Sequence, residues 1–274
     1  MEKRDKIYWH DAFFEALQLE LNHYRDSLDF DNEHHLSREA LIMDVLVIKK
    51  KSEERIDKNI GKIFKTHNIF EFKSEKDSLT EQDYNKVIAY ALLYSSFTPA
   101  PVSDITVSFA VTIHPRELIK YLREERGFTV QIAEDGIYYV KGDTFLVQIL
   151  ESKRLPSEEN LFIRNLRSNL SIEDVTKTAE AYRKLKPLEK KNAYLDRLIQ
   201  ANRNSFLEAM TVSNAVKELF FEVAEKDGWL VDRDYNREFE KAKAIAKKML
   251  IMGDSIEKVI EATELPYETV TNLM

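Results

Sequence analysis

The run from Leu41 to Ile48 (LIMDVLVI) constrains the fold more than any other segment of the chain. Apolar, largely β-branched residues occupy both its odd and its even positions, so a strand formed here must be buried on both faces. A sheet flanked by helices provides the two covering layers that such a strand needs. Asp44 stands in the middle of the run, where an unpaired carboxylate costs several kcal/mol and therefore needs a cation or several donors.

Helical and extended patterns alternate around this central strand. Apolar spacings of three and four predict helices over 7–24, 78–95 and 115–126. Extended patterns bounded by turn residues recur at 26–36, 68–72, 105–113, 128–133, 137–141 and 145–150. The segments around Glu-Asp-Gly136 predict a hairpin, and 26–36 has room for an edge strand. We therefore expect an α/β domain, a mixed sheet flanked by helices, over residues 1–155.

After Pro156 the strand patterns end and helical periodicity continues to the end of the sequence. The expected helices lie at 157–169, 171–185, 188–223, 235–252, 255–263 and 266–273. These segments predict an all-α C-terminal domain over residues 156–274. The last two helices resemble a helix-turn-helix, but the second lacks Arg and Lys, which favours a packing or dimerisation hairpin over a DNA-reading unit.

Composition excludes several classes of protein. No stretch approaches the roughly 20 apolar residues of a membrane span, and the first residues lack the apolar region of a secretion signal. The absence of cysteine excludes disulfides and thiolate zinc sites, and it is compatible with the cytoplasm, the location that we expect. A net charge of −7 argues against nucleic-acid binding by bulk attraction.

Two acidic residues and a lysine form the candidate site. Glu71 and Lys73 are two apart in an extended run, so their side chains share one face, while Phe70 and Phe72 cover the other. If this strand pairs with the strand that carries Asp44, the three polar groups meet. Two carboxylates, with the backbone carbonyl of Phe72 as a further ligand, suit Mg²⁺, and the lysine orients water or steadies a phosphate.

The pattern Asp44…Glu71-Phe72-Lys73 resembles the D…(D/E)-x-K signature of the PD-(D/E)XK nuclease superfamily, with Met43 in place of the proline. Wider segments resemble the bacterial transposase-like, recombination-promoting branch of that superfamily. They are HDAFFEALQLEL (10–21), LIMDVLVIKK (41–50), NIGKIFKTHNIFEFKS (59–74), YNKVIAYALLY (84–94) and MGDSIEKVIEATELPYETVTNL (252–273). The resemblance spans nearly the whole chain.

What the resemblance implies is a restriction-endonuclease-like sheet and a metal-dependent DNA endonuclease. Asp44 and Glu71 would bind Mg²⁺, for which Mn²⁺ is a possible substitute, and Lys73 would assist catalysis. DNA is the implied partner, and the implied processes are recombination, mobile elements or defence. A double-strand cut needs two sites, so this hypothesis is compatible with a homodimer.

Further residues are candidates on weaker grounds. Lys86 and Tyr90 share a helix face at i and i+4, where related nucleases often carry Gln-x-x-x-Tyr, so the resemblance suggests a nucleic-acid contact. The alternatives are a surface lysine and a core tyrosine. Lys49 and Lys50 belong to a lysine-rich stretch that forms either a basic patch or a solvated face.

Glu20, on the first helix, is the best candidate for an additional carboxylate near the metal, with Glu15 and Glu33 behind it. A second hypothesis keeps the fold but not the chemistry. The acidic balance and the altered Pro and Gln positions are compatible with a catalytically inactive nuclease-fold protein that acts as an interaction or nucleic-acid-binding module.

Overall fold

The structure is a computed structural model that describes residues 9–31, 46–52, 54–185, 193–226, 233–263, 265, 267–271 and 273. The chain forms two compact units. The first spans Met1–Leu170 with Lys184–Asn202, and the second spans Ser171–Arg183 with Arg203–Met274. Within the described residues, no helix combines the length and the apolar character needed to cross a membrane.

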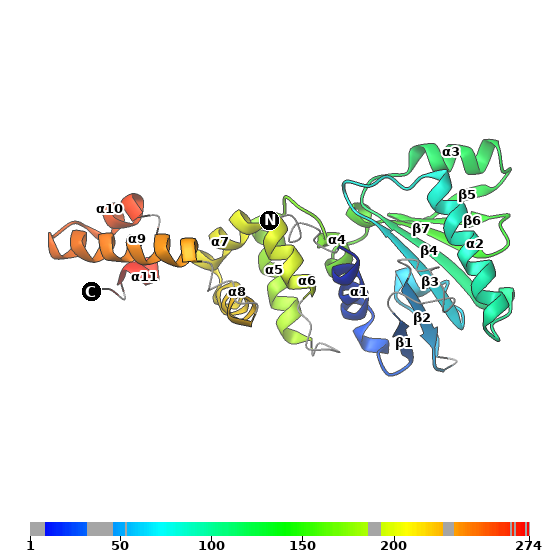
Figure 1. The fold of residues 1–274 in the computed structure, drawn as a ribbon, viewed down its shortest axis with the longest axis horizontal. Helices are drawn as coiled ribbons and strands as arrows, with labels where there is room; N and C mark the ends of the chain where they lie inside the picture. Colours follow the sequence, from blue (N-terminus) through cyan, green and yellow to red (C-terminus); the bar gives the residue numbers. More distant parts are fainter. Residues whose placement is uncertain are drawn as a thin grey trace. The chain divides into compact units, whose positions relative to one another are not determined.

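Within the described residues, a seven-stranded mixed sheet in the order β1-β2-β3-β4-β7-β6-β5 is the centre of the first unit (Figure 1). The strands are β1 (Leu28–Asp31), β2 (Leu46–Lys50), β3 (His67–Lys73), β4 (Ile105–Val111), β5 (Thr129–Glu134), β6 (Ile137–Lys141) and β7 (Leu146–Glu151). β3, β4 and β7 run parallel to one another, whereas the outer strands pair antiparallel. The edge strand in 26–36 and the hairpin at Gly136 are thus confirmed.

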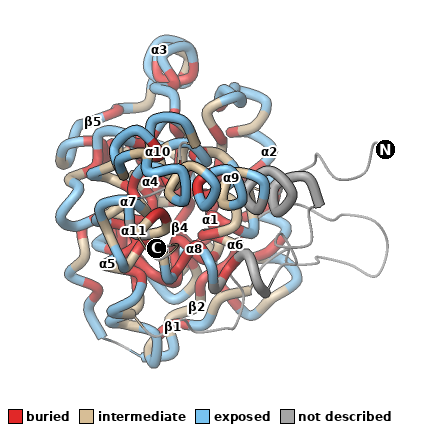
Figure 2. The backbone as a smooth tube through the Cα atoms, turned by 90° about the vertical axis from the view of Figure 1, so that its left-hand side faces the viewer, coloured by how far each residue is buried: buried red, intermediate tan, exposed pale blue. Residues whose placement is uncertain are grey.

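Helices cover both faces of this sheet. On one face lies α1 (Trp9–Glu20), whose Phe13 ring stacks on Phe72 with 4.5 Å between the ring centroids. The other face is covered by α2 (Glu81–Phe97) and α3 (Arg116–Glu124), whose apolar side chains join those of the strands in one core. Every residue of β4 is buried, and in Figure 2 the tube is red beside the labels of β4 and α1. The predicted α/β class is therefore confirmed.

Two short helices beyond residue 155 belong to the first unit because buried glutamates of α1 bind their first turns. Glu15 accepts a hydrogen bond from the backbone N–H of Tyr194 (2.8 Å), in α6 (Ala193–Ala201). Glu20 accepts hydrogen bonds from the N–H groups of Phe162 (2.6 Å) and Ile163 (3.1 Å), in α4 (Leu161–Asn165). A carboxylate at a helix N-terminus satisfies orphan N–H groups and complements the dipole. The sheet unit therefore extends past the predicted boundary.

The second unit is helical, as predicted for the C-terminal region. Its helices are α5 (Ile172–Lys184), α7 (Arg203–Val212), α8 (Asn214–Lys226), α9 (Arg233–Ile251), α10 (Ile256–Thr263) and α11 (Tyr267–Thr271). The apolar core shared by α9, α10 and α11 contains Ala246, Val259, Leu265 and Val270. The predicted helix 188–223 is divided into α6, α7 and α8. Asn202 ends α6, and its side chain bonds Leu170 N–H and the Arg167 carbonyl.

Single 3₁₀ turns connect several of these elements. They are η1 (Asn22–Tyr24), η2 (Asn59–Gly61), η3 (Val102–Asp104) and η4 (Ser152–Arg154). The turn between β5 and β6 packs directly against η4. Gly136 in that turn has a φ of +76°, and a Cβ atom there would lie 2.8 Å from the Leu155 nitrogen and 2.9 Å from the Glu151 oxygen.

Gly136→Ala should destabilise the fold more than Gly127→Ala. Both glycines have positive φ, which costs an L-residue about 1–2 kcal/mol. A Cβ at Gly127 meets nothing within 4 Å, so only Gly136→Ala adds a clash with backbone, worth about 1–3 kcal/mol more. Urea unfolding of the two variants measures the difference. Equal losses would show that the turn does not pack against η4 in solution.

Candidate active site

The side chains of Glu71 and Lys73 lie together at the carboxyl end of β3. In the parallel ladder Glu71 pairs with Phe109 and Lys73 with Val111, so both belong to the part of the sheet where strands run parallel. Their side chains are only 13% and 19% exposed. Ligands of open α/β sheets bind outside the carboxyl ends of the strands, and this edge carries the predicted catalytic pair.

The ammonium of Lys73 bridges two carboxylates. Its Nζ lies 3.4 Å from Glu71 Oε1 and donates a hydrogen bond to Asp83 Oδ1 at 2.8 Å. Asp83 is held by a capping box at the start of α2: its backbone N–H donates to Thr80 Oγ1, and its own Oδ2 accepts from the Thr80 N–H. The N-terminus of α2 therefore fixes the direction of the Lys73 side chain.

Asp83 was not among the residues predicted for the site. The Thr80-x-x-Asp83 spacing marks a helix start in the sequence, but it does not reveal which strand that helix start faces. The sequence could have indicated the cap, whereas the contact with Lys73 depends on tertiary packing.

The charges of this group are set by burial and by Lys73. Burial raises the pKa of Glu71 to about 7, against the lowering effect of Lys73 and, more weakly, of Lys86. Burial acts to lower the pKa of Lys73, but the hydrogen bond to Asp83 and the charge of Glu71 outweigh it and hold that pKa above its ordinary value. Burial would likewise raise the pKa of Asp83, yet its bonds to Lys73 and Thr80 hold it low. Lys73 is therefore protonated at neutral pH, whereas Glu71 is partly protonated near pH 7.

Lys86 and Tyr90 differ in exposure although both lie on α2. Lys86 is exposed, and its charge acts on Glu71. The Tyr90 side chain is completely buried in the core between α2 and the sheet, where burial raises its pKa. Tyr90 thus packs in the core, as its alternative interpretation stated, and it is not placed to contact a nucleic acid.

Lys49 and Lys50 lie away from the candidate site. Lys49 pairs with His67, the first residue of β3, whereas Lys73 is the last. Six residues of strand separate these ends, which corresponds to about 20 Å at 3.3 Å per residue. The two lysines do not line the site, so any nucleic-acid contact that they make is a separate one.

Glu20 is not part of the site either, which corrects the prediction of an additional metal carboxylate. Its Oε1 caps α4, and its Oε2 lies 2.9 Å from the ammonium of Lys58. Burial raises the pKa of Glu20 in spite of these partners. Moreover, α1 packs through Phe13 on the sheet face opposite Glu71. Glu15 has the corresponding capping role at α6.

Asp44 and Glu33 lie outside the described residues, so the expected carboxylate pair is described for Glu71 alone. Among the residues that the structure describes, no group of three or more His, Asp or Glu side chains could hold a metal. Of the predicted metal ligands, Glu71 is the carboxylate whose position the structure describes. The backbone carbonyl of Phe72 stays a predicted ligand.

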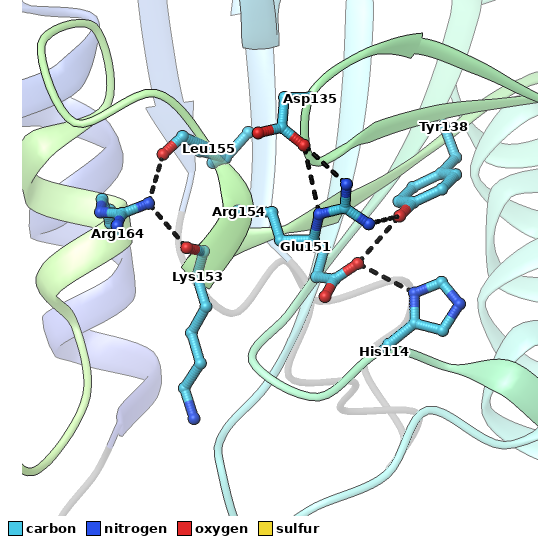
Figure 3. A network of polar contacts seen from close by, with 8 residues as sticks. All are labelled: His114, Asp135, Tyr138, Glu151, Lys153, Arg154, Leu155 and Arg164. Carbon is cyan, nitrogen blue, oxygen red and sulfur yellow. Dashed lines mark hydrogen bonds and ion pairs between the residues drawn. The ribbon is translucent and has the colours of Figure 1, made fainter.

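A second polar cluster lies at the carboxyl end of β7 (Figure 3). Glu151 Oε2 accepts hydrogen bonds from Tyr138 OH and pairs with His114 Nδ1, both at 2.9 Å. Arg154 donates to Tyr138 OH (3.2 Å) and to Asp135 (2.8 Å). These bonds tie the loop after β4, the hairpin turn and η4 together. The residues come from separate loops and strands between positions 114 and 154, and their spacing in the sequence does not predict the cluster.

No protein-family model, curated protein or solved structure that was compared matches this chain. The resemblance to PD-(D/E)XK nucleases therefore stays a prediction from the quoted segments, beside the geometry of Glu71 and Lys73.

Glu71→Gln should change stability in a pH-dependent manner. Because burial raises the pKa of Glu71 from 4.5 to about 7, ionising it opposes folding: the penalty is absent below about pH 4.5, grows as the pH rises and is complete above about pH 7. The variant lacks this penalty, so its stability relative to wild type should rise by about 3 kcal/mol between pH 4.5 and pH 8. Urea unfolding at several pH values measures the change, and a pH-independent difference would contradict it.

Proposed function

We propose that this chain is a Mg²⁺-dependent DNA endonuclease that hydrolyses phosphodiester bonds at the carboxyl end of β3. The observation that supports it most is the state of Glu71. This carboxylate is buried 3.4 Å from the ammonium of Lys73, and burial raises its pKa to about 7 although the charge of Lys73 acts to lower it. A perturbed carboxylate paired with a cation at the ligand-binding edge of a sheet is a candidate functional group.

A divalent cation fits the chemistry of Glu71. The carboxylate is a hard oxygen ligand of the kind that Mg²⁺ prefers, and Asp44 and the Phe72 carbonyl are the expected partners. In the sequence only Val45 separates Asp44 from Leu46, and Leu46 pairs with Phe70, the neighbour of Glu71. Bound there, Mg²⁺ would polarise the phosphate and lower the pKa of a bound water.

In the proposed site, Lys73 provides a positive charge close to the phosphate. Its raised pKa keeps it protonated, so it stabilises the negative charge that develops on the phosphate and does not serve as a base. Asp83 holds the ammonium from the side of α2, which restricts the number of positions that it can take. Lys86, exposed on the same helix, adds positive potential beside Glu71.

One observation favours the second hypothesis, an inactive nuclease-fold protein that binds a partner or a nucleic acid. The Lys73–Asp83 bond links β3 to the capping box of α2, and such a link stabilises the fold whether or not the site is active. The two hypotheses differ in metal dependence, because a purely structural bridge gains nothing from Mg²⁺.

Cleavage of DNA tests the proposal directly. The purified chain should nick or cut plasmid DNA with Mg²⁺ or Mn²⁺ and not with EDTA. Glu71→Gln, Lys73→Met and Asp44→Asn should each lower the rate about 100-fold or more, as expected when a group that stabilises transition-state charge is removed. Glu81→Gln and Lys76→Met, exposed positions of matching charge, are the controls. Equal rates in wild type and the three site variants would refute the proposal.

Thermal unfolding tests the metal site without activity. At Mg²⁺ ten times its Kd, linkage stabilises the native state by about 1.4 kcal/mol, which raises Tm by a few degrees in a chain of this size. Glu71→Gln should abolish the shift, whereas Glu81→Gln should retain it. A wild-type Tm that does not respond to Mg²⁺ or Mn²⁺ would favour the inactive hypothesis.

A further inference from the structure

Arg197 stacks on Trp9. The guanidinium carbon lies 3.7 Å from the centroid of the Trp9 ring, within the range of a cation–π interaction. Arg197 belongs to α6 and Trp9 begins α1, two helices that pack together in the first unit. The guanidinium therefore lies over the ring, and its N–H edges make no hydrogen bond with Trp9.

These edges have no protein acceptor in the described part of the chain. Arg197 makes no hydrogen bond or ion pair there, and its Nε–H is buried without a partner. A guanidinium carries five N–H donors, and native structures rarely leave a buried one unpaired. Burial lowers the pKa of Arg197, and the charge of Glu75 acts in the opposite direction.

Among the described carboxylates, Glu75 is the one whose charge acts on the pKa of Arg197, and Glu75 is hydrogen-bonded to another residue. Its two oxygens accept hydrogen bonds from the backbone N–H of Ser168, at 3.3 Å, and from the Ser168 hydroxyl. Glu75 therefore influences Arg197 through space without bonding it. Because Glu75 follows Lys73 by two residues, this field also locates Arg197 near the segment that leaves the candidate active site.

We infer that Arg197, held by Trp9, binds a phosphate group of the nucleic acid on which the candidate active site acts. The two Nη groups of Arg197 have no protein acceptor in the described residues and are not among the buried atoms, so they can donate to the paired oxygens of a phosphodiester. The aromatic ring stacked on the guanidinium suits single-stranded nucleic acid, in which arginine and aromatic side chains together contact backbone and bases. The identity of the ligand as a nucleic acid rests on the proposed function, whereas the anion site rests on Arg197 itself.

Trp9 provides the readout. The chain has two tryptophans, Trp9 and Trp229, so Trp229→Phe leaves Trp9 as the single indole. Inorganic phosphate and a short single-stranded DNA are titrated separately into this variant in EDTA, where no cleavage takes place. Both should change Trp9 emission saturably, because an anion on the guanidinium alters the charge stacked on the ring. DNA should bind more tightly than phosphate.

Variants separate an anion site from a structural stack. In the same background, Arg197→Gln should weaken DNA binding at least tenfold and lower the salt slope by about 0.7, the loss of one phosphate contact. Arg197→Lys keeps the charge on the ring but loses the fork, so it should bind DNA several-fold more weakly. Glu75→Gln removes a repulsive charge and should tighten binding. Arg55→Gln, an exposed arginine paired with Asp57, is the matched control.

Two results would overturn the inference: DNA affinity unchanged in both Arg197 variants, or binding of inorganic phosphate without binding of DNA. Circular dichroism verifies that each variant is folded, and Arg197→Lys decides the matter if Arg197→Gln is not. Since the titration contains no metal and measures no cleavage, it is independent of Glu71. A chain without nuclease activity can still pass this test, and an active nuclease can fail it.

Discussion

The burial of Glu71 beside Lys73 is the interaction on which the arrangement of this region depends. A carboxylate in the parallel part of the sheet requires a nearby cation, and Lys73 provides it from the same strand face. Lys73 in turn requires a second acceptor, which the capping box of α2 provides through Asp83. The start of α2 is thereby joined to the end of β3, and the polar groups at this edge are held in fixed directions.

Buried carboxylates elsewhere in the first unit are satisfied in a different manner. Glu15 and Glu20 accept hydrogen bonds from backbone N–H groups at helix starts. Glu151 accepts from Tyr138 and pairs with His114. Among these described residues, Glu71 alone relies on a single lysine that is shared with another acid, and its pKa reaches about 7. Burial raises the pKa of Glu20 as well, so the partners distinguish the two acids: Glu20 accepts hydrogen bonds from two backbone N–H groups beside Lys58, whereas Lys73 is the cation that contacts Glu71 in the described residues.

The sequence predicted the order of strands and helices because apolar periodicity reports which faces are buried. The same period of two placed Glu71 and Lys73 on one face. What periodicity could not supply was the partner of each polar group. Asp83 meets Lys73 only because α2 packs across β3, and Glu20 is taken up by a helix more than 140 positions later in the chain. Tyr90 lies four residues after the exposed Lys86, a spacing that suggested a shared surface. Its side chain is nevertheless fully buried, because this part of α2 packs against the sheet.

The acidic net charge also limits how a chain with the proposed function could approach DNA. Three lysines of the lysine-rich stretch 49–65 already have partners within the protein: Lys58 pairs with Glu20, Lys62 pairs with Glu134, and Lys65 donates to a backbone carbonyl. The electrostatic attraction that this stretch exerts on a nucleic acid is therefore weak, although the stretch is rich in lysine. A nucleic-acid enzyme of this charge must depend on few cations in defined positions, where desolvation makes each contact stronger than at an exposed surface. Lys73 and Arg197 are cations of this kind, because each is partly buried and directed by a neighbouring side chain.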